Sequence, residues 1–215
     1  MIGRFALIAG REVARAWRGG GLWPPVAFFL MVAILFPFGV GPDKLLLAKT
    51  GSGVAWMAAL LAALLPVERL VEHDRADGTL DQLVVRGLSD ETVAAAKIAG
   101  HWLGFAPPLL LATLPAAALL GLDGRALGVL LAGLAIGTPA LASLGVTAAA
   151  LTAGIRGAGA VAGLIVLPLA VPVLIFGASA AARGPEALKL LGAASLVLTA
   201  LGPFAAGAAL RATRS

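Results

Sequence analysis

Residues 68–85, ERLVEHDRADGTLDQLVV, open the only long polar segment of the chain, which continues to residue 97. Those 30 residues hold seven acidic and four basic side chains. The segment is therefore locally negative, although the whole chain has a net charge of +5. The rest of the chain is mostly apolar, so this stretch divides it.

Within the segment, residues 79–82 (TLDQ) have the spacing of a capping box, in which the threonine hydroxyl and the glutamine amide satisfy backbone N–H groups at a helix start. Leu80, Leu83 and Val84 then fall on one face of a short helix that ends at Gly87. Anionic lipid headgroups repel a net-negative segment, and a merely solvated loop needs neither a cap nor an apolar stripe. We therefore predict that another protein docks here.

The composition excludes a soluble protein, because 60% of the residues are hydrophobic, 13% are charged and the mean hydropathy is +0.99. Six uncharged runs each reach about 18 residues or more, the length that crosses a hydrocarbon core of roughly 30 Å. The sequence predicts an all-α integral membrane protein that is one domain, residues 1–215. The expected spans are approximately residues 22–40, 51–67, 98–121, 128–152, 159–181 and 190–210, with a cytoplasmic loop at 68–97.

The distribution of basic residues predicts the orientation of these spans. If the amino terminus is inside, eleven basic residues face the inner side and five the outer side. The inner set is Arg4, Arg11, Arg15, Arg18, Arg69, Arg75, Arg86, Lys97, Arg156, Arg211 and Arg214, and the outer set is Lys44, Lys49, Arg125, Arg183 and Lys189. We expect both termini in the cytoplasm of a bacterial inner membrane, or on the equivalent side of an organelle membrane.

Residues 2–18 predict an amphipathic helix before the first span. Arg4, Arg11, Arg15 and Arg18 fall on one face at helical spacing, with apolar residues opposite. This pattern favours an interfacial helix that binds the anionic inner leaflet through the four arginines. A signal peptide is the alternative, but the apolar run at 19–42 is long for one and no A-x-A cleavage site follows it.

Small residues and tryptophans indicate how the spans pack. Gly133-x-x-x-Gly137 allows two helices to approach closely, either within the chain or between subunits. Trp23, Trp56 and Trp102 each lie within a turn or two of a span end, where tryptophan anchors a protein in the membrane interface. All three are therefore expected at the interfaces.

Several kinds of chemistry have no residues to support them. No charged residue or histidine lies deep in a predicted span, which disfavours a pump, a proton-coupled carrier or an intramembrane hydrolase. The chain has no cysteine, and Lys49-Thr50 lacks the glycine-rich loop of a P-loop. If ATP drives this protein, another polypeptide must hydrolyse it.

The two histidines have competing interpretations. His73 lies among Glu72, Asp74 and Asp77, a composition that suits a metal site but also an ordinary solvated loop, and we assign no metal to it. His101 and Trp102 stand at the predicted inner interface. They are weak candidates for contact with haem or a partner protein, against a hydrogen-bonded interfacial histidine.

Nine ordered stretches resemble one known family. They are Arg11-Glu12 and residues 35–47, 53–65, 68–83, 96–103, 136–145, 149–156, 167–178 and 203–211. Together they cover nearly the whole chain, and in this combination they resemble CcmB, the membrane subunit of the haem-exporter-type ABC transporter in cytochrome c maturation.

The resemblance implies an ABC-2-like permease of six helices whose cytoplasmic coupling helix sits on a P-loop ATPase subunit. It also implies partnership with the haem-handling and small membrane subunits of that complex and, indirectly, with the periplasmic haem chaperone that ATP hydrolysis releases. ATP and haem are then bound by partner subunits, so no cofactor is assigned to this chain, which is not itself an enzyme.

The predicted docking element consists of Asp77, Gly78, Thr79, Leu80, Asp81, Gln82 and Leu83. Asp81 would set polarity, Leu80 and Leu83 would fill a groove of the ATPase, and Gly78 would permit the turn before the cap. The alternatives are a permease for a lipid or another hydrophobic compound, a passive scaffold and an integral membrane enzyme, for which no clustered polar site near a span end is found.

Overall fold

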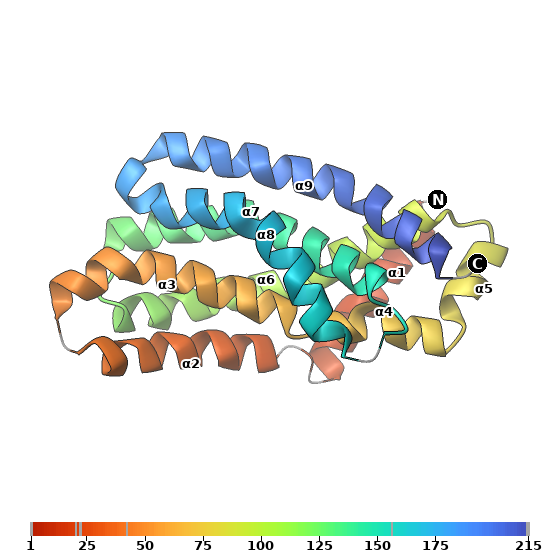
Figure 1. Ribbon diagram of the computed structural model, residues 1–215, viewed down its shortest axis with the longest axis horizontal. Coiled ribbons are helices and arrows are strands. Elements are labelled where there is room, and N and C mark those ends of the chain that lie inside the picture. The colour runs from red at the N-terminus through yellow and green to blue at the C-terminus, as the bar shows by residue number, and fades with distance from the viewer. Residues whose placement is uncertain (1, 20, 22, 42, 156, 214–215) are drawn as a thin grey trace.

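Six long helices lie lengthwise in the computed structural model (Figure 1). The structure describes residues 2–19, 21, 23–41, 43–155 and 157–213, without the side chain of Ile2. Arg156 and Arg214, which the orientation prediction used, and residue 22, where the first span was expected to begin, lie outside the described residues. The described part of the chain contains helices and no strand.

The helices follow the order that the uncharged runs predict. Their bounds are α1 Ile2–Arg18, α2 Trp23–Val40, α3 Lys44–Leu64, α4 Val67–Ala76, α5 Thr79–Val85, α6 Asp90–Leu119, α7 Gly124–Leu151, α8 Ala158–Arg183 and α9 Pro185–Ala212. Six helical segments, with α3 and α4 counted as one, are long and apolar enough to cross a membrane. The predicted fold class, an all-α protein with six candidate spans, is confirmed.

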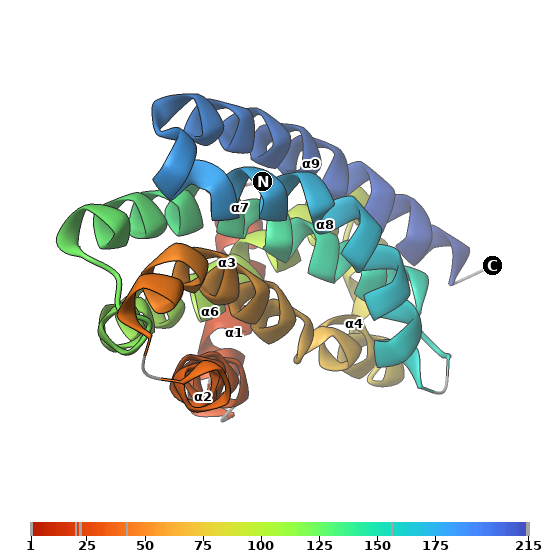
Figure 2. The same cartoon turned by 60° about the vertical axis from the view of Figure 1, so that its left-hand side comes forward.

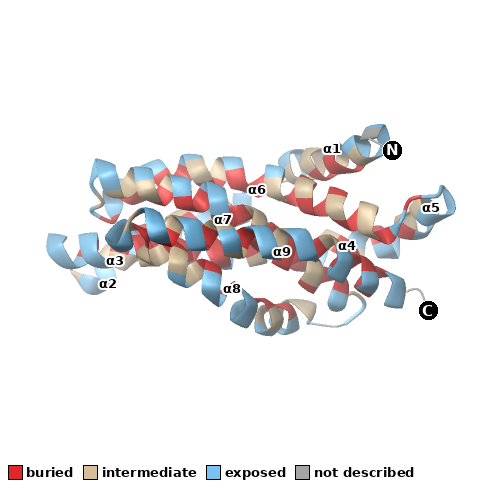
Figure 3. Cartoon of the chain, turned by 90° about the horizontal axis from the view of Figure 1, so that it is seen from above, coloured by how far each residue is buried: buried red, intermediate tan, exposed pale blue. Residues whose placement is uncertain are grey.

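Helix α7 lies at the centre of the bundle, and α2 lies at its edge. In the most apolar part of each helix, 67% of the residues of α7 are buried, compared with 17% for α2. Figure 3 shows the difference as buried residues along α6 and α7 and exposed ones along α2. The exposed apolar faces of α2, α8 and α9 are those that lipid or other membrane subunits can cover.

Trp56 of α3 fills the space between α3, α7 and α8, and this overturns its predicted interfacial position. Its side chain is 0% exposed, and its indole N–H has no hydrogen-bond partner within the described part of the chain. A Cβ atom added at Gly137 would lie 2.6 Å from the indole ring, and Gly133 and Gly177 also face it. The Gly133-x-x-x-Gly137 motif therefore makes room for a tryptophan of the same chain.

Helix α1 crosses α6 near the end of the molecule where α4, α5 and the last turn of α9 also lie (Figures 1 and 2). Gly100 and Gly104 of α6 permit this close crossing, because a Cβ atom at Gly100 would lie 2.8 Å from the carbonyl oxygen of Ala9. Ile8 and Ala9 are buried in the contact. The amphipathic helix predicted over residues 2–18 is thus present, and its apolar face is covered at least partly by protein.

Candidate functional site

Helix α4 carries three carboxylates that contact other parts of the chain. It begins directly after Pro66, which ends the apolar helix α3 and turns the chain toward the polar segment. Glu68 and Glu72 are four residues apart and therefore share one face of α4, whereas Asp74 lies on the other side. Each face contacts a different group of helices.

Asp74 is completely buried and accepts hydrogen bonds from three cations. Its Oδ2 atom lies 2.6 Å from Nη2 of Arg11, and its Oδ1 atom lies 3.2 Å from Nη1 of Arg15. Lys97 of α6, only 2% exposed, donates its ammonium group to the same carboxylate. A buried charge is costly unless it is paired, and here each of the two most buried charges, Asp74 and Lys97, has the other as a partner.

Glu12 completes this group from α1. Its Oε1 atom accepts a hydrogen bond from Nζ of Lys97 at 3.1 Å, and its side chain is 9% exposed. Lys97 also donates to the carbonyl oxygen of Leu70 at 2.9 Å, so all three N–H bonds of its ammonium group have acceptors. We call Arg11, Glu12, Arg15, Asp74 and Lys97 the ion cluster; it joins α1, α4 and α6.

The ion cluster changes the interpretation of the four arginines predicted to bind the inner leaflet. Arg11 and Arg15 have side chains that are 36% exposed and direct their guanidinium groups to Asp74. Arg4 donates from Nη1 to the carbonyl oxygen of Arg86 at 2.8 Å. Arg18 is exposed, and its side chain makes no hydrogen bond or ion pair with another residue that the structure describes. For Arg11 and Arg15 the prediction missed the main contact, which is a carboxylate of the same chain.

The other face of α4 holds the turn between α7 and α8. The backbone N–H of Gly154 donates to Glu72 at 2.9 Å, and that of Gly159 donates to Glu68 at 2.7 Å. Gly157, the residue before α8, provides no side-chain cap. Glu68 therefore supplies the carboxylate that the amino-terminal end of α8 favours, but from a different helix.

The start of α5 differs from the predicted capping box. Gly78 has φ +66°, in the left-handed region that glycine adopts easily, and it occupies the cap position without a side-chain hydrogen bond. Thr79 is consequently the first helical residue and not the cap, so the capping box at residues 79–82 is wrong. The predicted turn at Gly78 and the end of the helix before Gly87, φ +82°, are confirmed.

Burial divides the predicted docking residues into two groups. Leu80 is 3% exposed and belongs to the core of this chain. The prediction that it inserts into a groove of a partner is therefore wrong. Leu83 is half-buried, whereas Asp77, Asp81 and Gln82 are exposed. The most exposed apolar residue of α5 is Val85, at 87%. Hydrophobic spacing alone could not tell which face of so short a helix turns inward.

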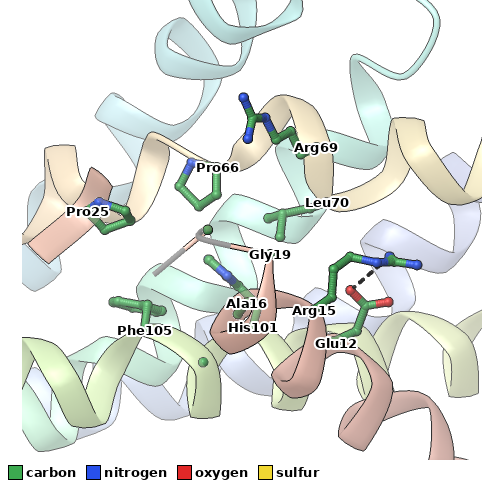
Figure 4. A pocket seen from close by; sticks show the side chains of 12 residues that line it. Glu12, Arg15, Ala16, Gly19, Pro25, Pro66, Arg69, Leu70, His101 and Phe105 are labelled. Atoms are coloured by element: carbon green, nitrogen blue, oxygen red, sulfur yellow. Dashed lines mark ion pairs between the residues drawn. The ribbon is translucent and has the colours of Figure 1, made fainter. Parts of the chain in front are cut away.

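His101 and Trp102 both contact other residues within the bundle. The ring of His101 is 7% exposed and stacks on Phe105 with 4.9 Å between ring centres, beside a cavity of about 150 Å³ that Pro25 and Pro66 also line (Figure 4). Nε1 of Trp102 donates to Oγ1 of Thr138 at 3.0 Å. Ligand pockets usually measure roughly 300–1,000 Å³, so we do not pursue a haem contact at these residues.

His73 faces one neighbouring carboxylate, with Nε2 3.5 Å from Oδ2 of Asp77, and both side chains are more than half exposed. Among the residues that the structure describes, no group of three or more potential ligands is placed to hold a metal ion. His73 lies in the last turn of helix α4, so the predicted loop is helical at this position, and its side chain is exposed.

Three residues of the ion cluster, Glu12, Asp74 and Lys97, were not predicted as site residues. A signal for Glu12 was present, because it is the only acid in a helix with four arginines. Lys97 stands directly before the apolar run that starts at residue 98, where a lysine is usually explained by its membrane flank. Their pairing spans 85 residues of sequence, which no local pattern can indicate.

Comparison with known proteins gives a consistent result. The sequence model of the family described as "CcmB protein" matches residues 4–213. A curated relative from Paracoccus denitrificans, "Heme exporter protein B", is 46% identical over 208 residues, which cover 94% of this chain and 95% of the relative. Proteins of the same name from Bradyrhizobium diazoefficiens and Haemophilus influenzae are 43% and 42% identical; the alignments cover 94% and 96% of this chain, and 94% and 97% of the relatives.

Proposed function

The chain belongs to the CcmB family, and from this premise we propose that it is the membrane subunit of a haem exporter that couples ATP hydrolysis by a partner ATPase to movement of its own helices. The observation that carries the proposal is the position of α4. This helix follows α3 and precedes the exposed helix α5; its Asp74 contacts α1 and α6, and Glu68 and Glu72 on its other face contact the turn between α7 and α8 and the start of α8.

The proposed coupling begins at α5. The ATPase dimer docks on the exposed residues of this helix, with Asp81 and Val85 at the contact, and closes when it binds ATP. Helix α5 follows α4 after a turn of two residues, so a displacement of α5 pulls on α4. Asp74 then carries the displacement to α1 and α6, and Glu68 and Glu72 carry it to the turn that begins α8.

The choice of partners follows from the family and from the relatives' name. We propose that the haem-handling subunit, a small membrane subunit and the ATPase form one complex with this chain in a bacterial inner membrane, with both termini and α4–α5 in the cytoplasm. ATP binds to the ATPase and haem to the partner subunits. The conformational change releases the haem-loaded chaperone on the opposite side of the membrane.

The test is co-purification from native membranes in mild detergent, followed by mass spectrometry of the bound subunits. We expect a P-loop ATPase together with proteins of cytochrome c maturation. An ATPase without those proteins would indicate a permease for a lipid or another hydrophobic compound. If no ATPase is bound, the coupling proposal is wrong and a passive scaffold is left.

A point substitution locates the contact on α5. Val85→Asp introduces a charge at a residue that is 87% exposed, so the fold should persist while the ATPase is lost from the purified complex. Leu45→Asp is the matched control, because Leu45 is 81% exposed at the start of α3, on the side predicted to face away from the cytoplasm. Equal recovery of the ATPase with both variants would contradict docking on α5.

A further inference from the structure

The cavity beside His101 lies between helices α1 and α4 and the candidate membrane spans, and we call it the junction cavity. Its volume of about 150 Å³ is enough for several water molecules. Figure 4 shows Arg15 and Glu12 of the ion cluster on one side of it and Pro25 and Phe105 on the other. Both of the latter residues lie within predicted spans, in α2 and α6. The junction cavity therefore separates the ion cluster from the membrane part of the bundle.

The ion cluster joins three helical segments into one unit. Lys97 of α6 bonds Asp74 of α4 and Glu12 of α1, and both carboxylates are buried. Gly100, nearly one turn further along α6, brings that helix into close contact with α1. Separation of buried, paired charges is costly, so we expect these segments to move together. We call α1, α4 and residues 90–104 of α6 the ionic block.

Two of the three connections from this block to a span run through residues at which a helix bends easily. Helix α1 joins α2 through a glycine-rich turn, in which Gly19 and Gly21 line the junction cavity. In α6 the block ends at Gly104, which also lines the cavity. Pro107 and Pro108 follow, and they remove two backbone N–H donors from the helix.

Pro66 forms the third connection, because it interrupts the chain between α3 and α4. Proline has no backbone N–H, so the carbonyl oxygen of Ala62 accepts from the N–H of Leu65 instead, at 3.3 Å. Leu70, one turn further along, is half-buried and lines the junction cavity. A rotation of α4 about Pro66 can therefore use this space for the side chain of Leu70.

We propose that the ionic block moves as one rigid body, that it pivots where Gly19, Pro66 and Gly104 line the junction cavity, and that the cavity provides the space for this movement. The inference rests on the proposed function and adds to it the segments that move together and the points at which they bend. A bundle packed at ordinary interior density would resist such a rotation, because few voids are left between its side chains. Filling the cavity should therefore block the movement although the ATPase stays bound.

Distances between pairs of spin labels test the movement in the purified complex, because the chain has no cysteine and labels can be attached to introduced ones. His73 on α4, Met57 on α3 and Leu7 on α1 are exposed positions for them. The complex with its ATPase is measured without nucleotide and with a non-hydrolysable ATP analogue. We expect the mean distance in Met57→Cys/His73→Cys to change by several ångströms, and that in Leu7→Cys/His73→Cys to stay constant.

Replacing the proline between α3 and α4 tests one pivot. Pro66→Ala supplies the N–H that the carbonyl oxygen of Ala62 lacks, and should join α3 and α4 into one helix. We expect the distance across this point to become constant and haem attachment to cytochrome c to fall severalfold, with the ATPase still bound. Pro185→Ala is the matched control and should change neither, because Pro185 is the first residue of α9, where no intrahelical bond is lost.

Filling the cavity tests the need for space. Leu70→Trp enlarges a side chain that lines the junction cavity, and Leu61→Trp adds the same ring at an exposed position of α3. Haem attachment should fall severalfold with Leu70→Trp, less with the smaller Leu70→Phe, and not with Leu61→Trp. Normal attachment with Leu70→Trp would overturn the inference.

The remaining outcomes separate the inference from the proposed function. If nucleotide leaves the distance between positions 57 and 73 constant, or changes the distance between positions 7 and 73, the ionic block does not move as one body. Normal haem attachment with Pro66→Ala would equally overturn the inference, while the bound ATPase leaves the proposed function standing. If the wild-type complex contains no ATPase, the proposed function itself fails.

Discussion

Two regions of this molecule are held together by opposite means. Around Trp56, the helices approach through glycine, and the contact contains no charge. Around Asp74, the helices approach through five charged side chains that belong to three different helices. The first region fixes the helices by the shape of one ring, and the second fixes them by charge. The apolar helices α3, α7 and α8 are thus held together by close packing on a buried ring, whereas α1, α4 and α6 are held together by paired charges.

Removing the buried carboxylate should produce the largest effect. Asp74→Ala leaves Lys97 2% exposed with Glu12 as its only anionic partner, which should lower the free energy of unfolding by about 3–5 kcal/mol. Thermal unfolding in detergent measures this. The double variant Asp74→Ala/Lys97→Met should regain most of the stability, because no buried ammonium group remains. An equal loss of stability in the single and double variants would show that the buried charge of Lys97 does not cause the destabilisation.

Filling the glycine contact should cost somewhat less. Gly177→Leu places a side chain against the indole of Trp56, and overpacking of this kind should lower stability by about 1–3 kcal/mol or more. Gly163→Ala on the same helix is the matched control, because an added Cβ there meets nothing within 4 Å. The same unfolding assay should separate the two variants, and equal melting would contradict the packing described around Trp56.

Neutralising Glu68 or Glu72 on the acidic face of α4 should lower the free energy of unfolding by a smaller amount. Glu68→Gln and Glu72→Gln keep an acceptor oxygen for Gly159 and Gly154 but remove the charge, so each should cost about 0.5–1.5 kcal/mol. Hydrogen exchange of the Gly154 and Gly159 amides should accelerate in these variants. Unchanged exchange would mean that Glu68 and Glu72 do not hold the turn between α7 and α8.

An exposed ion pair at the other end of the bundle should contribute the least to stability. Glu186 and Lys189 lie 2.8 Å apart, but their side chains are 76% and 72% exposed. Lys189→Ala should therefore change stability by at most about 1 kcal/mol. A change as large as that of Asp74→Ala would show that burial is not what distinguishes the ion cluster.

Much of the fold could be predicted because each apolar run had to be long enough to cross a membrane and each break carried charge. The cap of α6 is equally local, because Ser89 accepts a hydrogen bond from the backbone N–H of Thr92, three residues later. Trp56 was misplaced because its distance from a span end is a local feature, whereas the glycines that receive its ring lie on α7 and α8.

The candidate site could be predicted only in part. The polar segment was recognised from its charges, and the turn at Gly78 from its glycine. The inward face of α5 and the partners of Asp74 depend on how α1 crosses α6. Two glycines four residues apart permit this crossing, but their spacing alone does not predict it. Arg11 and Asp74 are 63 residues apart in sequence and touch only in the folded bundle.

The role of α4 is tested most directly by the double variant Glu68→Gln/Glu72→Gln in cells that make c-type cytochromes. We expect the ATPase still to co-purify with this chain, because α5 is untouched, while covalent attachment of haem to cytochrome c falls severalfold. Normal cytochrome c maturation with the ATPase still bound would contradict the claim that α4 transmits movement from α5 to the membrane helices.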